Sequence, residues 1–229
     1  MANIIGNPTL GFQSFGNAEG SSPTQGLTPV WIASTDPGLI FRGDPVMTST
    51  SPGSNLSGAY ITSLNNNAIT TPGFLCRGIF QGCYQFQPAA GRVVWSNFYN
   101  GAVTGSTGDV KAYVIDFPDA QFIVQASTKA AILSSQIGLN VGITYNTTTG
   151  NTTTGLSNVT VESTSAIGGS SMPFRIVDFY SAYAPPGGLQ GPAVGTGAFI
   201  NGTDNTTPAN MVIVRLNNCD RLNLTARSA

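Results

Sequence analysis

The stretch Val110–Gln125, VKAYVIDFPDAQFIVQ, carries an apolar run on each side of Pro118-Asp119. Proline and aspartate are typical turn residues, and the alternation on both sides indicates β-strands. With Phe117–Ala120 as the four turn residues, the pattern predicts a β-hairpin with one apolar face. The residues expected to face each other are Ile115 with Phe122 and Tyr113 with Val124. A longer loop that includes Asp116 is the alternative, because two-residue hairpin loops prefer turns of the opposite hand.

The segment Phe74–Phe86, which precedes this stretch, combines aromatic residues and glycines at alternate positions, so a single strand would carry both on one face. Glycine weakens a strand unless something packs closely against it. Gly78 and Gly82 therefore indicate a bent sheet, or aromatic rings that lie over bare backbone. We expect Phe80 in the core, and also Trp95 on the next strand. Together with the hairpin residues Tyr113, Ile115, Phe122 and Val124, they make up the predicted core.

Short apolar stretches broken by turn residues continue along the rest of the chain and predict an all-β fold. The further expected strands are Pro29–Ala33, Leu39–Arg42, Pro45–Thr48, Ala59–Thr62, Arg92–Tyr99, Asn140–Tyr145, Val159–Glu162, Pro173–Tyr180 and Ala209–Leu216. Residues 126–136 contain the one short helix that we expect, capped by Ser127 or Thr128. The Asn/Thr/Gly tract Tyr145–Thr160 is expected to be an exposed loop. We predict a single β-barrel or sandwich-like domain over residues 28–229.

Residues 1–27 are expected to form an extended N-terminal arm, because their apolar residues follow neither a helical nor a strand period. Those residues are Ile4, Ile5, Leu10, Phe12 and Phe15. Apolar side chains without a local partner favour contact with a neighbouring subunit or another protein, with the two phenylalanines as anchors. A disordered tail is the alternative.

The composition bounds the classes of function. Charged residues make up 8% of the 229 residues, against about 25% in an average soluble protein, and the net charge is −1. The chain has no basic stripe for nucleic acid and no apolar run near the roughly 20 residues of a membrane helix. It also lacks a secretory signal, which predicts synthesis in a cytoplasm. A surface with few charges is typical of a protein covered by copies of itself or by a partner, and a neutral monomer is the alternative.

The chain contains no histidine, which removes Ser-His-Asp and Cys-His arrangements and the usual zinc ligand sets. Phosphate-cradling and dinucleotide-binding glycine motifs are absent as well. The three cysteines are an odd number and are expected to be buried thiols. We therefore expect no enzymatic activity, no cofactor and no metal. Two carboxylates that meet from distant strands, as in a glycosidase, are the alternative.

Several short motifs occur in an order typical of one known family. They are Gly11-Phe12, Phe41–Val46 with the sequence FRGDPV, Gly78–Tyr84 with GIFQGCY, the stretch Asp116–Gln125, Ile137–Asn140 with IGLN, and Arg175–Val177. On these motifs the chain resembles a family of tailed-bacteriophage virion proteins that decorate the capsid, also called cement proteins. The resemblance covers most of residues 10–216.

The resemblance implies a β-rich subunit, most simply a homotrimer, that binds the outer surface of the phage capsid. It would stabilise the shell by bridging capsomers, with the major capsid protein and its own copies as partners. The expected location is the outside of the virion, after synthesis in the host cytoplasm. The alternative function is a carbohydrate-binding adhesin or fibre-base module, with Tyr145, Tyr180 and Tyr183 presenting a glycan surface.

Overall fold

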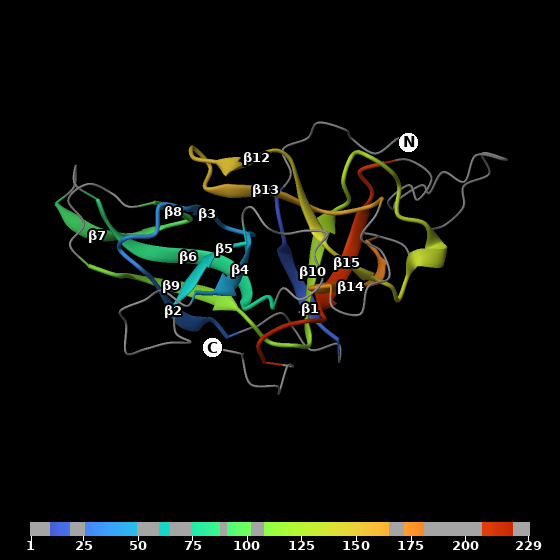
Figure 1. Ribbon diagram of the computed structural model, residues 1–229, viewed down its shortest axis with the longest axis horizontal. Helices are drawn as coiled ribbons and strands as arrows, with labels where there is room; N and C mark the ends of the chain where they lie inside the picture. Colours follow the sequence, from blue (N-terminus) through green and yellow to red (C-terminus); the bar gives the residue numbers. More distant parts are fainter. Residues whose placement is uncertain are drawn as a thin grey trace.

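The computed structural model describes residues 10–18, 26–49, 60–64, 75–87, 91–101, 108–164, 172–180 and 208–221. Within these ranges the chain is built almost entirely from antiparallel β-strands (Figure 1). The helical element that they contain is a three-residue 3-10 turn at Ser134–Gln136. The predicted all-β fold with at most one short helix is confirmed.

Two larger sheets form the body of the molecule. The first runs in the order β1 (Gln13–Asn17), β10 (Ala120–Gln125), β15 (Met211–Leu216), β14 (Phe174–Phe179) and β11 (Asn140–Val141). The second runs in the order β2 (Thr28–Ile32), β9 (Val110–Ile115), β6 (Gly78–Gln87), β4 (Pro45–Thr48) and β5 (Ile61–Ser63), and β7 (Arg92–Ser96) also pairs with β6. The expected strand Ala209–Leu216 thus lies inside its sheet, between β10 and β14.

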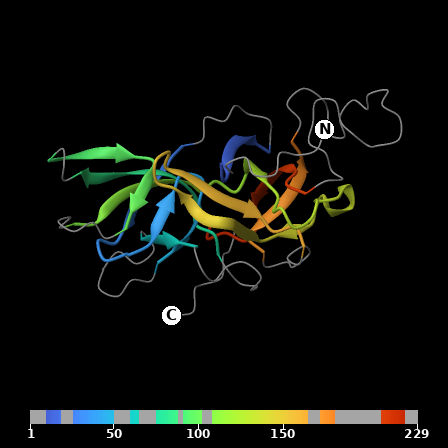
Figure 2. The same ribbon diagram turned by 90° about the horizontal axis from the view of Figure 1, so that it is seen from above.

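Two smaller sheets complete the sandwich-like arrangement. One joins β3 (Leu39–Phe41) to β8 (Phe98–Asn100), and the other joins β12 (Ile143–Asn151) to β13 (Leu156–Val161). The hairpin β12–β13 lies along one side of the molecule and reaches from the second sheet to the first (Figures 1 and 2). One apolar core cluster unites this hairpin with the first sheet, and another unites β3 and β8 with the second sheet.

The stretch Val110–Gln125 does not form a hairpin. The amide of Ala120 donates to the carbonyl of Phe117 at 3.0 Å, so the chain does reverse at the predicted turn. However, β9 pairs with β2 and β6, whereas β10 pairs with β1 and β15. Pro118 favours turn types whose twist splays the flanking strands. The turn is therefore a corner between the two large sheets, and the predicted pairs across it do not exist.

The Asn/Thr/Gly tract is a β-hairpin and not an exposed loop. Threonine has a high strand propensity, and the side chain of Asn151 accepts hydrogen bonds from the amides of Thr153 and Thr154 to form the turn. Ser157 and Thr160 are buried. The prediction of a loop was wrong because it rested on the low-complexity composition of the tract and not on the turn and strand preferences of its individual residues.

The expected helix over residues 126–136 does not form before its last three residues. The amide of Ala126 donates to the carbonyl of Asn210, and the amide and carbonyl of Ile132 bond to the Asn210 side chain. These contacts to a distant segment replace the local hydrogen bonds of a helix, so tertiary partners override the helical propensity.

Candidate functional site

Four of the predicted core residues are buried: Phe80, Ile115, Phe122 and Val124. Two are not, because Trp95 is 43% exposed and Tyr113 is half-buried on the outer face of the second sheet. A bulge interrupts the β6–β9 register between Phe80 and Gly82. One extra residue in a strand reverses the alternation of its side chains, so Phe80 points inward while Tyr84, farther along, points outward. The sequence pattern placed Phe80 and Tyr84 on one face of a regular strand, and this placement is wrong because of the bulge.

The N-terminal residues are partly integrated into the fold. Residues 13–17 form β1, which pairs with β10, so this part of the expected arm belongs to the first sheet of the chain itself. Phe12 is 1% exposed and stacks on Phe174 with ring centroids 4.4 Å apart. Its assignment as a partner contact is therefore wrong, because the chain's own core accommodates the ring. Leu10 and Phe15 are 48% and 42% exposed, and Ile4 and Ile5 lie outside the described residues.

Three motifs of the family resemblance meet at Gly43, at what we call the Gly43 junction: Gly11-Phe12, Arg42–Asp44 and Phe80. The carbonyl of Gly43 accepts from the amide of Phe12 at 3.0 Å, and its amide donates to the carbonyl of Phe80 at 2.9 Å. Gly43 has φ +93°, and a Cβ there would lie 2.9 Å from the carbonyl oxygen of Leu10. Only glycine fits such a conformation and such a close approach without strain.

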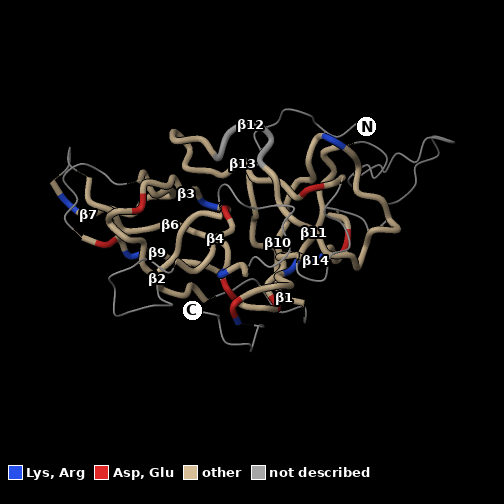
Figure 3. Tube along the Cα trace, in the orientation of Figure 1, with Lys and Arg blue, Asp and Glu red and all other residues tan. Residues whose placement is uncertain are grey.

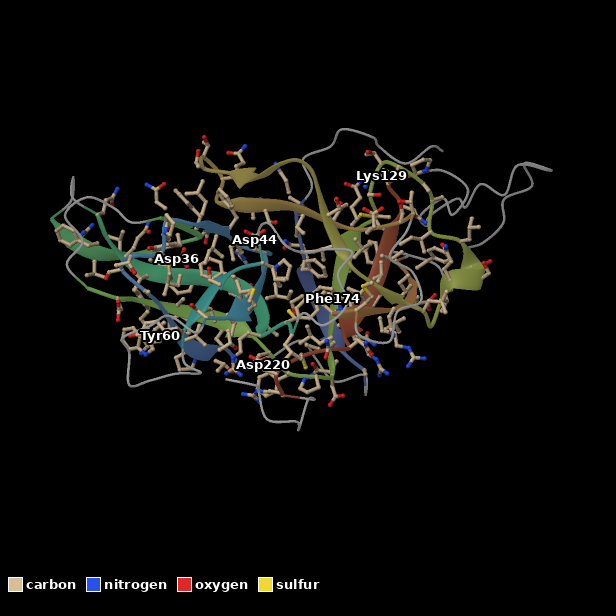
Figure 4. The ribbon with its side chains drawn as sticks, in the orientation of Figure 1. Asp36, Asp44, Tyr60, Lys129, Phe174 and Asp220 are labelled. Carbon is tan, nitrogen blue, oxygen red and sulfur yellow. The ribbon has the colours of Figure 1, made fainter. Side chains whose placement is uncertain are left out.

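The hairpin β12–β13 closes the Gly43 junction. The amide of Arg42 donates to the carbonyl of Gly155, and the amide of Ser157 donates to the carbonyl of Arg42, both at 3.0 Å. Asp44 lies between the two large sheets (Figure 4) and accepts hydrogen bonds from the Ser157 hydroxyl and the Phe41 amide. Burial raises the pKa of Asp44 to about 7, although these two hydrogen bonds oppose the shift.

Asp116 follows β9 directly and is fully buried. Its carboxylate contacts Arg221 Nε at 3.0 Å and Arg77 Nη2 at 3.3 Å, and it accepts from the Thr28 hydroxyl at 2.7 Å. Asp116 thus joins three segments that are distant in the sequence. A carboxylate with two cationic partners is the arrangement that makes a buried charge tolerable.

Glu162 is buried at the end of β13 and contacts Lys129 Nζ at 2.9 Å. Burial raises its pKa, but hydrogen bonds from Lys129 and Thr164 outweigh burial and hold the pKa of Glu162 below its usual value. Within the described ranges, no three histidine, cysteine, aspartate or glutamate side chains are grouped so that they can hold a metal ion. The buried carboxylates of Asp44, Asp116 and Glu162 thus each join segments that are distant in the sequence.

The outer face of the second sheet presents an exposed cluster of aromatic rings, which we call the aromatic face. Tyr84, Trp95 and Tyr113 contact one another, with ring centroids 5.2, 5.7 and 6.0 Å apart. A Cβ at Gly82 would lie 2.3 Å from the Trp95 ring. The indole therefore lies against bare backbone, as the sequence predicted for an aromatic ring near this glycine.

Strand pairing extends the aromatic face across four strands. Trp31 on β2 lies opposite Lys111 on β9, Lys111 lies opposite Tyr84 on β6, and Tyr84 lies opposite Trp95 on β7. Directly opposed residues project to the same side of a sheet. Phe86 and Val93 form the next opposed pair on this side and are also exposed. The chain's two tryptophans thus both lie on the aromatic face.

Charged residues are sparse along the described part of the chain (Figure 3). Lys111 is the charged residue of the aromatic face on these four strands, and its Nζ lies 5.7 Å from the centroid of the Tyr113 ring. Sequence reasoning missed this face because it assigned Trp95 and Tyr113 to the core. The available signal was the alternation of Trp31, Tyr113 and Trp95 with small or β-branched residues that fill the interior.

Comparison of the chain with protein-family models, with curated proteins and with solved structures finds no match. In the part of the chain that the structure describes, no helix is long and apolar enough to cross a membrane.

Proposed function

We propose that the chain is a structural protein of a tailed-bacteriophage virion that binds the outer surface of the capsid and stabilises it by bridging capsomers. The Gly43 junction carries this proposal. Three separate motifs of the resemblance meet here, because the backbone of Gly43 bonds to both Phe12 and Phe80. Motifs that are distant in sequence and joined in space belong to one structural requirement, which supports a fold shared with the decoration proteins.

The surface composition also supports a bridging role. A decoration protein contributes to shell stability by covering seams between subunits, which requires interface area and no catalytic group. Few charges and an exposed apolar residue such as Phe15 on the edge strand β1 suit contacts of this kind. We propose the major capsid protein and further copies of this chain as partners, in a homotrimer on the outside of the virion.

The proposal is tested by adding the protein to undecorated phage heads and measuring occupancy by quantitative gel analysis. Phe15→Ser should reduce occupancy strongly, because an aromatic anchor at a protein interface is worth about 2 kcal/mol or more. Leu139→Ser is the matched control, since Leu139 is similarly exposed but lies next to β11 at the other edge of the first sheet. Absence of binding by the wild-type protein would reject the decoration function. Equal occupancy for all three proteins would reject the Phe15 contact.

The second candidate function is a glycan-binding adhesin, and the tyrosines that the sequence suggested for it, Tyr145, Tyr180 and Tyr183, give it little support. Tyr180 packs edge-to-face on Phe15 with centroids 6.0 Å apart. Tyr183 and the side chain of Tyr145 lie outside the described part of the structure.

A further inference from the structure

We propose that the aromatic face of the second sheet is a binding site for a neutral oligosaccharide. The aromatic face is made by β2, β9, β6 and β7, whereas the proposed capsid contact at Phe15 lies on β1 of the first sheet. In Figure 1 the strands β7, β6, β9 and β2 lie on the left, whereas β1 lies near the middle beside β10. The proposal adds a second activity to capsid binding and does not depend on it.

The position of Trp95 is the first step of the argument. One side of its indole lies against Gly82, while 43% of the residue remains exposed to solvent. The face of an aromatic ring carries partial negative charge and attracts the partly positive C–H groups of a sugar ring that stacks on it. Because Gly82 has no side chain, the indole packs directly against the backbone of β6, and its contacts with Tyr84 and Tyr113 hold it in place while part of it stays exposed. A preorganised surface of this kind reduces the entropic cost of binding.

The charge of the aromatic face defines the class of saccharide. Lys111 supplies the one charge among the strand residues of this face, and its ammonium lies near the negative face of the Tyr113 ring. An acidic polysaccharide would require several cations, so the arrangement favours a neutral one. The Lys111 ammonium and the hydroxyls of Tyr84 and Tyr113 can form hydrogen bonds with sugar hydroxyls.

The dimensions favour an oligosaccharide over a protein partner. The row from Trp31 to Trp95 crosses three strand spacings, about 14 Å, which exceeds a single sugar ring. Large aromatic side chains bury about 150–250 Å² each, so the partly exposed residues of this face offer roughly 400 Å². A stable protein interface needs about 800 Å² on each partner. The rings alone thus supply about half of the area that a stable protein interface needs on one partner, whereas they are sufficient for a chain of several sugars.

Affinity electrophoresis tests the proposal directly. The full-length protein should be retarded in native gels that contain a soluble neutral polysaccharide from a panel of dextran, laminarin, mannan and arabinoxylan. Matching oligosaccharides should change the intrinsic tryptophan fluorescence, because both tryptophans lie on the aromatic face. Trp95→Ala should lower the affinity about tenfold or more. Tyr84→Ala should also weaken binding, and it keeps both tryptophans as reporters. Unchanged circular dichroism and denaturation midpoints would establish that both variants are folded.

The controls separate this site from the capsid contact. Phe15→Ser should bind the polysaccharide normally, and Trp95→Ala should occupy phage heads normally. No retardation with any polysaccharide of the panel would overturn the proposal, and so would retardation that survives both Trp95→Ala and Tyr84→Ala. Loss of head occupancy in a folded Trp95→Ala variant that binds no polysaccharide would instead assign the aromatic face to the capsid.

Discussion

Asp44 makes the stability of the protein depend on pH. Its carboxyl has a pKa of about 7 in the fold, against an ordinary value of 3.8, because it is buried. The folded state therefore holds a proton that the unfolded chain releases between these two values. The resulting stabilisation is complete below about pH 4 and is lost as the pH rises through 7. A shift of this size corresponds to a few kcal/mol.

We expect Asp44→Asn to remove this dependence. The amide oxygen can accept from the Phe41 amide, and its NH₂ group can donate to the Ser157 hydroxyl, so the variant should fold. The free energy of unfolding in urea, measured from pH 4 to pH 8, should fall more steeply with pH for the wild type. Glu162, whose pKa is lowered, contributes in the opposite direction in both proteins and cancels in the comparison. Parallel curves would show that Asp44 is not protonated in the fold.

The three cysteines are expected to be unreactive while the protein is folded. All three are buried thiols, as the sequence predicted. Burial raises the pKa of Cys83 to about 12 and also raises that of Cys76, so little of the reactive thiolate forms. A chromogenic disulfide reagent should detect almost no thiol in the native protein at pH 8 and three thiols in denaturant. Rapid titration of a thiol without denaturant would contradict this description of the core.

Strand β10 is expected to be indispensable to the first sheet. Phe122 is buried in the core and packs edge-to-face on Phe12 at 6.2 Å. Phe122→Ala should cost about 3–5 kcal/mol of unfolding free energy in chemical denaturation, because it leaves a cavity. Val93→Ala on the exposed end of β7 should change stability by less than about 0.5 kcal/mol. A similarly small loss for Phe122→Ala would remove this residue from the core.

Strands were more predictable from the sequence than their partners. Apolar stretches located β2, β3, β4, β9, β10, β14 and β15, because burial leaves a local pattern. The turn Phe117–Ala120 was predictable too, since Pro118 restricts the backbone locally. The pairing of β10 with β1 and β15 was not predictable, because these partners are distant in sequence and the turn gives no information about them. Trp95 was misplaced because an aromatic residue on a strand suits either face of a sheet.

The proposed oligomer should depend weakly on salt. The described part of the chain carries few charged residues (Figure 3), so contacts between copies should rely on neutral polar and apolar groups, which ions do not screen. Light scattering at micromolar protein concentration should give the mass of a trimer, and this mass should persist from low salt to about 1 M. A monomer, or dissociation on modest addition of salt, would contradict the proposed assembly.

The order of strands in the first sheet has a consequence for biosynthesis. β15 occupies the middle of that sheet, between β10 and β14, although it follows both in the chain. At a translation rate of about 5–20 residues per second, β10 leaves the ribosome several seconds before its neighbour exists. During this interval Phe122 and Val124 lack their cross-strand neighbours Val214 and Val212. Nascent chains that stop short of residue 211 should therefore depend on chaperones and aggregate when these are absent, whereas the completed chain can close the sheet by inserting β15 last.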